Sequence, residues 1–253
     1  MGGLLEKMQS FMSDRVFLPY GDKPIIHFLF QAGFLFTVPK KEFSDLKKIR
    51  QIVKVKPYTL LSYSRLAKLY ELALLIEKTS VQGDFVECGV CNGGSAGLVA
   101  NIFKNNAARD IWLFDSWKGM PDPGPKDAFA DGGQNKKGIA LGYLSKVENL
   151  FFSVLGCPRD RVHLVKGWFQ DTLPLTISSL KNISLLHIDC DWYESVKFCL
   201  ERLFDKVVNG GYVVIDDYGY WKGCRKAVDE FFAERKLTNK IIPIDYAGVY
   251  FQK

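Results

Sequence analysis

Short apolar runs alternate with helical segments along most of this chain, and this alternation constrains the fold more than any other feature of the sequence. Runs with strand character lie at residues 83–90, 110–116, 160–168, 183–191, 210–219, 240–245 and 248–252. Segments predicted to be helical lie at 59–78, 95–106, 145–156, 195–207 and 223–236. Strands that alternate with helices predict an α/β fold, with a Rossmann-like doubly wound, mainly parallel sheet and right-handed crossovers.

Residues 1–56 precede this alternation, and we expect an N-terminal helical extension or arm followed by one domain at 57–253. The apolar stretch at 25–38 is too short and too interrupted to span a bilayer. We expect it to pack on the core or on a second subunit, as in a homodimer or larger oligomer. Contact with a membrane surface or a lipid substrate is the alternative. The charged segment at 39–57 is predicted to lie on the surface.

The charges and cysteines exclude several classes of protein. Lys and Arg number 34 against 28 Asp and Glu, which gives a net charge of +6. Because these charges are spread along the chain, they indicate solubility and an acidic substrate rather than nucleic-acid binding. Among six cysteines only Cys88 and Cys91 have C-x-x-C spacing, and no second pair completes a zinc site. Cysteines in apolar runs and the lack of a visible signal peptide favour a reducing cytoplasm.

A glycine-rich turn, "VECGVCNGGSAG" at 86–97, joins the first predicted strand to a helix. Ligands of doubly wound sheets bind outside the carboxyl ends of the strands, where Gly89, Gly93 and Gly94 would allow a ligand to approach the backbone. The turn lacks the G-x-G-x-x-G pattern of dinucleotide sites and the Gly-Lys-Ser/Thr of a P-loop. Glu87 suits a positively charged ligand such as a sulfonium. A plain turn between strand and helix is the alternative.

Asp115 ends the second predicted strand, where an acid can accept hydrogen bonds from ribose hydroxyl groups. The alternative is an Asp that caps the next turn. Beyond it, residues 116–142 form a long segment rich in Gly, Pro and Lys. A loop of this length in a compact domain is usually a lid or disordered.

Two pairs of acids end the next two strands. Asp189 and Asp191 stand at the end of one strand, and Asp216 and Asp217 at the end of the other. Carboxylates that converge at neighbouring strand ends repel one another unless they are protonated or bind a cation. An all-oxygen set suits Mg²⁺, Ca²⁺ or Mn²⁺ rather than zinc. The alternative is that Asp191 caps the following helix and Asp217 begins a turn.

Six motifs, in this order, resemble the macrocin O-methyltransferase family: "GDFVECGVCNGGSA", "LFDSWKGMP", "VKGWFQDTLP", "IDCDWYES", "GGYVVIDDYG" and "CRKAVDEF". The resemblance covers roughly residues 57–235, and the layout is more distantly similar to catechol-type metal-dependent O-methyltransferases. It implies a Rossmann-like enzyme that uses S-adenosylmethionine and Mg²⁺ to methylate a hydroxyl group of a sugar or sugar-containing natural product. The small-molecule acceptor would sit under the loop at 116–142.

The resemblance also assigns roles to particular residues. Asp189, Asp216 and Asp217 would ligate Mg²⁺, and Asp191 would be the general base, with a metal-bound carboxylate such as Asp189 as the alternative. Residues implied in binding the methionine end, the ribose, the adenine or the outer side of the cofactor are Glu87, Gly89, Ser95, Asp115, Lys166, Gly167, Trp168, Tyr58 and Ser64.

Two departures from the family pattern leave the acceptor open. Cys91-Asn92 stands where the family commonly has Trp-Arg, and residues 190–193 read Cys-Asp-Trp-Tyr in place of Gly-Asp-Leu-Tyr. Two other functions remain as alternatives: a metal-dependent glycosyltransferase that uses the Asp-x-Asp pair, and a non-catalytic cofactor-binding partner. An NAD oxidoreductase would need the glycine fingerprint that is absent.

Overall fold

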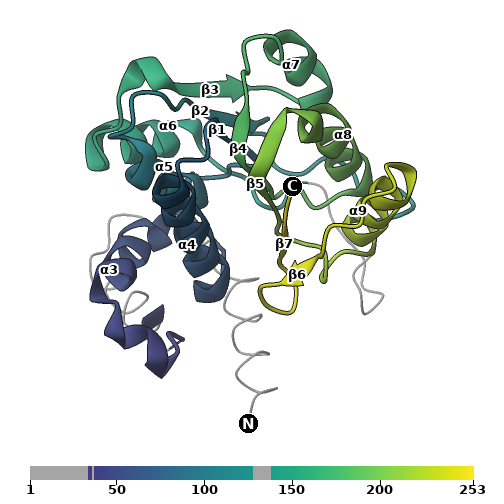
Figure 1. Cartoon of the computed structure of the whole chain (residues 1–253). Coiled ribbons are helices and arrows are strands. Elements are labelled where there is room, and N and C mark those ends of the chain that lie inside the picture. Colours follow the sequence, from purple (N-terminus) through teal and green to yellow (C-terminus); the bar gives the residue numbers. More distant parts are fainter. Residues whose placement is uncertain (1–33, 36, 128–137) are drawn as a thin grey trace.

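The computed structural model describes residues 34–35, 37–127 and 138–253, which fold around a seven-stranded sheet (Figure 1). The strands are β1 (Asp84–Cys88), β2 (Ile111–Asp115), β3 (Val162–Lys166), β4 (Ile183–Ile188), β5 (Val207–Ile215), β6 (Ile242–Pro243) and β7 (Val249–Gln252). Their order is β3-β2-β1-β4-β5-β7-β6. The first five are parallel, and β7 runs antiparallel to its two neighbours. The predicted doubly wound, mainly parallel fold is confirmed.

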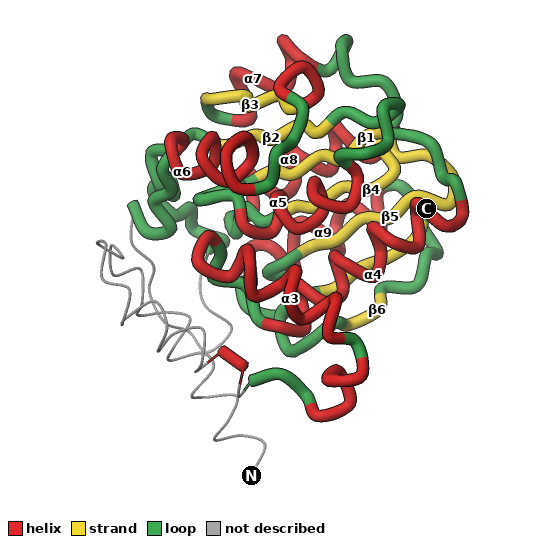
Figure 2. Tube along the Cα trace, turned by 90° about the vertical axis from the view of Figure 1, so that its left-hand side faces the viewer, coloured by secondary structure: helices red, strands yellow, loops and turns green. Residues whose placement is uncertain are grey.

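Helices cover both faces of the sheet (Figures 1 and 2). They are α3 (Leu46–Val55), α4 (Tyr63–Thr79), α5 (Gly94–Phe103), α6 (Leu144–Glu148), α7 (Phe169–Thr176), α8 (Tyr193–Leu203) and α9 (Lys222–Glu234). Alternate strand residues point to opposite faces. Phe85 therefore joins a core with α3, α4 and α5, whereas Val86 joins one with α7, α8 and α9. No described helix is long and apolar enough to cross a membrane.

Two helices were not anticipated. The charged segment at 39–57, predicted as surface, contains α3, whose Ile49, Ile52 and Val55 are buried. Its cationic residues hid this apolar stripe, and one of them, Lys48, is itself buried in ion pairs with two glutamates. Helix α7, which contains Pro174, was also missed. The helix predicted at 145–156 divides into α6 and a π-helix at Asn149–Val154.

Short 3₁₀ turns connect the larger elements. They lie at Lys40–Ser44, Lys56–Tyr58, Arg159–Arg161 and Phe204–Lys206. Of the apolar stretch at 25–38, only residues 34, 35, 37 and 38 are described, so the expected arm lies mainly outside the described residues. Phe34 and Val38 at its end are buried in the core that contains α3 and α4.

The strand order reverses between β1 and β4, and this reversal positions the site. Cys88 pairs with both Phe114 and Ile188, and Ile188 pairs with Ile215. The residues that follow these positions are Gly89, Asp115, Asp189 and Asp216, so they form one row at the carboxyl edge of the sheet. A crevice opens at such a reversal because the connections on its two sides diverge to opposite faces.

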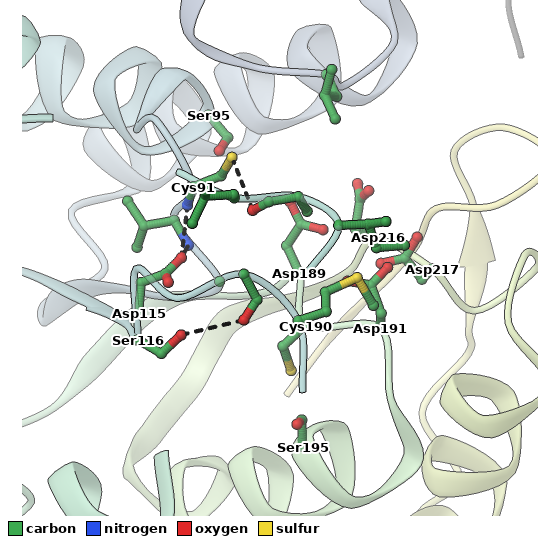
Figure 3. Close-up of a pocket in the computed structure, with 18 of the residues that line it drawn as sticks. Cys91, Ser95, Asp115, Ser116, Asp189, Cys190, Asp191, Ser195, Asp216 and Asp217 are labelled. Atoms are coloured by element: carbon green, nitrogen blue, oxygen red, sulfur yellow. Dashed lines mark hydrogen bonds between the residues drawn. The ribbon is translucent and has the colours of Figure 1, made fainter. Parts of the chain in front are cut away.

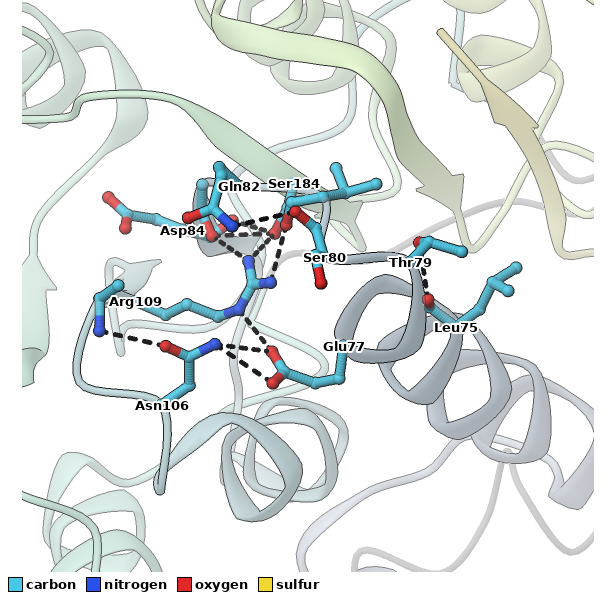
Figure 4. Close-up of polar contacts among 12 residues, drawn as sticks. Leu75, Glu77, Thr79, Ser80, Gln82, Asp84, Asn106, Arg109 and Ser184 are labelled. Carbon is cyan, nitrogen blue, oxygen red and sulfur yellow. Dashed lines mark hydrogen bonds and ion pairs between the residues drawn. The ribbon is translucent and has the colours of Figure 1, made fainter.

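The opposite edge of the sheet is held by a buried arginine (Figure 4). The Arg109 guanidinium is 2% exposed and pairs with Glu77 at the end of α4. It also donates to the Gly83 carbonyl, to the Val81 carbonyl at 2.7 Å and to Ser184 Oγ at 3.1 Å. One side chain thereby joins α4, the starts of β1 and β4, and the segment before β2.

Replacing this arginine should destabilise the fold strongly. We expect Arg109→Met to lower the free energy of unfolding by about 3–5 kcal/mol, because it removes the cation paired with Glu77 and the guanidinium donors to the Val81 and Gly83 carbonyl groups. Urea unfolding followed by circular dichroism measures this change. The control Arg202→Met, on the exposed surface of α8, should change it by about 0.5 kcal/mol or less. Equal losses of unfolding free energy in Arg109→Met and Arg202→Met would contradict the structural role assigned to Arg109.

Candidate functional site

A cavity of about 770 Å³ lies at the carboxyl edge of the sheet (Figure 3), a size that suits a small-molecule ligand. The predicted site residues that line it are Tyr58, Gly89, Ser95, Asp115, Gly167, Trp168, Asp189, Asp191, Asp216 and Asp217. Three others do not line it. Ser64 is exposed on the first turn of α4, Lys166 is exposed at the end of β3, and Glu87 is fully buried.

The glycine turn is shaped by its contact with the end of β4. Gly89 has a φ of +91°, and a Cβ atom there would lie 1.7 Å from the carbonyl oxygen of Asp189. Only glycine permits this backbone approach. Gly93, with a φ of +87°, is the N-cap of α5, and Ser95 in the first turn of that helix lines the cavity. The first N–H groups of a helix are available to a ligand.

Asp115 holds the glycine turn in place. Its Oδ2 accepts hydrogen bonds from the backbone N–H groups of Val90 and Cys91, both at 2.8 Å, and its Oδ1 accepts one from Trp117 at 2.6 Å. A carboxylate has about four acceptor positions. Three are filled, so in this arrangement Asp115 can accept a hydrogen bond from one ribose hydroxyl group rather than from two.

Glu87 does not line the cavity itself, but it is hydrogen-bonded to Ser95, which does. Ser95 Oγ donates to Glu87 Oε1 at 2.8 Å, and His187 Nδ1 lies 2.9 Å from Oε2. The other ring nitrogen of His187 lies 4.0 Å from Asp216 Oδ1. His187 was not anticipated, although it lies only two residues before Asp189. It places a buried polar chain between the glycine turn and the acids.

Asp189, Asp216 and Asp217 converge as expected: one oxygen from each lies within 4.8 Å of the others. Asp216 Oδ1 and Asp217 Oδ2 are buried and have no hydrogen-bond partner. Burial and the neighbouring carboxylates raise the pKa of Asp189 and of Asp217 well above the ordinary range. A bound cation would relieve this repulsion, and the all-oxygen donor set fits a hard divalent ion.

Asp191 is held beside this cluster. Its backbone is in the left-handed region, with a φ of +58°, and Trp221 Nε1 donates to its Oδ1 at 2.6 Å. Burial raises the pKa of Asp191 to about 6. The interpretation of Asp191 as a helix cap is wrong, because the N–H of Tyr193 in α8 bonds to Asp127 at 2.8 Å instead.

Asp217 has both of the roles that were considered. Its backbone carbonyl accepts hydrogen bonds from the N–H groups of Tyr220 and Trp221, so it does begin a turn. Its side chain nevertheless points to the acidic cluster, where Oδ2 is unpartnered. The turn therefore leaves the carboxyl group available to a cation.

Arg65 and Asp245 complete the site and were also missed. Arg65, on α4, forms a buried ion pair with Asp216 and another with Asp245, whose Oδ2 lies 3.2 Å from Nε. The sequence signal was a single arginine within the mostly apolar helix "YSRLAKLYELALLIEK". Asp245 lies in the turn between β6 and β7, far from any predicted motif.

Both described ends of the loop at 116–142 contribute to the cavity wall. Met120 and Ile139 line it, and the Met120 N–H bonds to the Ile139 carbonyl at 3.0 Å. Residues 128–137 lie outside the described residues. Asn92 accepts a hydrogen bond from the Tyr143 N–H, and Cys91 Sγ lies 3.6 Å from the Ala140 carbonyl. Cys91 and Asn92 therefore both contact the returning end of the loop.

Aromatic rings form the wall beside the acids. Trp192 and Trp221 meet edge to face with centroids 5.1 Å apart, and Tyr220 packs on Trp221 at 4.9 Å. Tyr246 packs on Tyr220 at 6.3 Å and is 49% exposed. Three of these rings, those of Tyr220, Trp221 and Tyr246, line the cavity. An apolar wall beside polar groups is typical of a site for a small organic ligand.

The sequence profile of the family described as Macrocin-O-methyltransferase (TylF) matches residues 39–253, beyond the range in which the motifs were recognised. The demethyldecarbamoylnovobiocin O-methyltransferase of Streptomyces niveus is 32% identical over 201 residues, which are 78% of this chain and 76% of that protein. The mycinamicin III 3''-O-methyltransferase of Micromonospora griseorubida is 30% identical over 202 residues, 78% of each chain.

Solved structures agree with these matches. The O-methyltransferase NovP superposes with a TM-score of 0.69 at 32% identity, over 78% of this chain and 82% of that chain. The calicheamicin methyltransferase CalS11 superposes with a TM-score of 0.60 over 92% and 94% of the two chains. Its identity is 21%, so this likeness concerns the fold alone.

The contact between Gly89 and Asp189 can be tested by a pair of glycine substitutions. Gly156 also has a positive φ, +65°, but has open space around its Cβ position. We expect Gly156→Ala to lower the free energy of unfolding by about 1–2 kcal/mol through backbone strain alone. Gly89→Ala should exceed this loss by about 2 kcal/mol or more, because it adds a collision with backbone atoms. Denaturant unfolding measures both, and equal losses would disprove the close approach.

Proposed function

Since the chain belongs to the macrocin O-methyltransferase family, whose members are S-adenosylmethionine-dependent O-methyltransferases, we propose that it methylates a hydroxyl group of a sugar or sugar-containing natural product with the aid of Mg²⁺. One observation carries the proposal: three converging carboxylates, two of which have a buried oxygen without a hydrogen-bond partner, share a cavity with the glycine turn. The relatives described above are named for demethyldecarbamoylnovobiocin and mycinamicin III, and a third, 31% identical over 200 residues, is named for 4'-O-methylation of a rhamnosyl-substituted tetracenomycin C. These names support a sugar-containing acceptor.

The methyl donor would occupy the β1 and β2 side of the cavity. Gly89 and Ser95 would contact its methionine end, and Asp115 would accept a hydrogen bond from the ribose. Gly167 and Trp168 would lie near the adenine, with Tyr58 on the outer side. S-adenosylmethionine supplies an electrophilic methyl group on a positively charged sulfur. Glu87 would act indirectly, by orienting the Ser95 hydroxyl group.

The metal would be held by Asp189, Asp216 and Asp217, whose oxygens already converge. A Mg²⁺ ion in such a site lowers the pKa of an acceptor hydroxyl group and fixes its orientation. The carboxylate oxygens present match the ligands that Mg²⁺ prefers.

Asp191 is the proposed general base. It would take the proton from the acceptor hydroxyl group while the acceptor oxygen bonds to the methyl carbon and the carbon–sulfur bond breaks. A base with a pKa of about 6 is matched to this task near neutral pH. The Trp221 N–H holds Oδ1 of this carboxylate in place, and the Asp217 side chain is a second hydrogen-bond partner of Asp191. Asp189 is the alternative base.

The cavity wall would exclude water from the reaction. Methyl transfer from a sulfonium to an ionised oxygen neutralises charge, so removal of water favours it. Met120 and Ile139 from the loop, with Tyr220 and Trp221 opposite, would provide that exclusion. Alignment of the two reactants would contribute much of the rate.

Calorimetric titration with S-adenosylhomocysteine, with and without Mg²⁺, tests the cofactor assignment. We expect binding in the micromolar range that does not require the metal. Transfer of a labelled methyl group to simple rhamnosides, with phenols as the comparison, then tests the acceptor class. Binding of UDP-glucose in place of S-adenosylhomocysteine would overturn the proposal and favour a glycosyltransferase.

A pair of substitutions separates the metal ligand from the base. Asp216→Asn should abolish methyl transfer and weaken Mn²⁺ binding about tenfold or more, because it removes one ligand charge. Asp191→Asn should reduce methyl transfer about 100- to 10,000-fold and retain Mn²⁺ binding. Electron paramagnetic resonance measures bound Mn²⁺, and calorimetry should show unchanged S-adenosylhomocysteine affinity in both. A parallel loss of cofactor and activity in Asp216→Asn would contradict separate sites.

A further inference from the structure

Arg65 lies directly beside the three converging carboxylates, and we propose that it restricts Asp216 to a single ligand oxygen, so that the site selects Mg²⁺ or Mn²⁺ over Ca²⁺. Arg65 would thus be a positioning residue that acts through Asp216. This inference rests on the proposed function, because it presupposes a divalent cation bound by Asp189, Asp216 and Asp217.

The two oxygens of Asp216 have different surroundings. Oδ2 forms the ion pair with the Arg65 guanidinium, whereas Oδ1 is buried without a hydrogen-bond partner. Asp216 contributes one oxygen to the converging set. Both residues are buried, at 9% and 3% exposure. A buried guanidinium that is already paired does not readily release its carboxylate oxygen. Asp216 therefore presents one oxygen to a cation.

Arg65 itself is held from several sides. Its Nε pairs with Asp245 Oδ2 at 3.2 Å, and the Ser62 hydroxyl group donates to that same oxygen at 2.8 Å. Asp245 Oδ1 accepts hydrogen bonds from the N–H groups of Ala247 and Gly248, at 2.9 and 2.8 Å. The planar guanidinium is thereby fixed between two carboxylates, a geometry that a lysine ammonium would not reproduce.

The aliphatic part of Arg65 is confined as well. A Cβ atom on Gly248 would lie 3.0 Å from Arg65 Cδ, so the chain passes closely over the arginine stem. The start of α4 and the turn between β6 and β7 thus enclose the side chain. Rotation of Asp216 to present both oxygens would require these contacts to break.

This restriction bears on which cation the site accepts. Ca²⁺ takes six to eight oxygens in flexible geometry and often uses both oxygens of a carboxylate, whereas Mg²⁺ requires six near-octahedral ligands and keeps several waters. One oxygen from Asp216 favours the smaller ion. The positive charge of Arg65 weakens the attraction for every divalent cation alike, so the ratio of affinities reports geometry rather than charge.

The test is the ratio of the Ca²⁺ and Mg²⁺ dissociation constants, measured by displacement of Mn²⁺ with electron paramagnetic resonance on the full chain. We expect Arg65→Gln to increase Ca²⁺ affinity relative to Mg²⁺ about tenfold, because Asp216 Oδ2 becomes available. Asp245→Asn retains the arginine but loosens its anchor, and should shift the ratio in the same direction by a smaller factor. The distant surface control Arg202→Gln should leave the ratio unchanged.

Four results are informative. A changed ratio in Arg65→Gln and Asp245→Asn, with unchanged S-adenosylhomocysteine affinity, supports the inference. Equal gains in affinity for Ca²⁺ and Mg²⁺ would mean that Arg65 acts only through its positive charge. That result would overturn the inference but leave the proposed metal site standing. Absence of any Mn²⁺ binding in the unaltered protein would overturn both this inference and the proposed metal. Should Arg65→Gln not fold, an unchanged ratio in Asp245→Asn alone overturns the inference.

Discussion

Repulsion between carboxylates at the ends of β4 and β5 is the constraint on which the rest of the site depends. Asp189, Asp216 and Asp217 bring their oxygens within 4.8 Å of one another inside a folded core, an arrangement that costs free energy unless positive charge offsets it. Arg65 supplies one fixed charge, and a divalent cation would supply the remainder. The fold itself therefore creates the cluster of negative charge that would attract the proposed metal ion.

The need to offset this carboxylate repulsion accounts for the side chains that distant segments contribute at this edge. Arg65 comes from α4, Asp245 from the turn before β7, and His187 from within β4, where it faces Glu87. Two groups of polar contacts result, one from Ser95 through Glu87 to His187 and the other from Asp216 through Arg65 and Asp245 to Ser62. They approach each other at 4.0 Å, between His187 Nε2 and Asp216 Oδ1. Burial makes each contact in such a network depend on its neighbours.

The two edges of the sheet have different tasks. At the amino edge, the Arg109 guanidinium has a partner at each of its nitrogens, and nothing in that cluster is oriented toward the cavity. At the carboxyl edge, buried oxygens of Asp216 and Asp217 lack partners. A ligand-binding site must keep polar groups without hydrogen-bond partners, which destabilise the fold. The fully hydrogen-bonded cluster at the amino edge contributes stability that offsets this cost.

By itself the sequence determined the strands, the helices of clear periodicity and the row of motifs at strand ends, because a parallel sheet places all carboxyl ends of its strands at one edge. It therefore predicted that Asp115, Asp189 and Asp216 would share a site. Helix α3 escaped prediction because its stripe of Ile49, Ile52 and Val55 lies among lysines.

Only the tertiary structure decided how those motif residues are used. Arg65 meets Asp216 across 151 positions of sequence, and His187 meets Glu87 across 100. No local pattern encodes such pairs, since they depend on how α4 docks on the sheet and how the turn after β6 closes over it. Long-range packing likewise showed that Asp115 supports the glycine turn and that Asp127, rather than Asp191, bonds to the first N–H of α8.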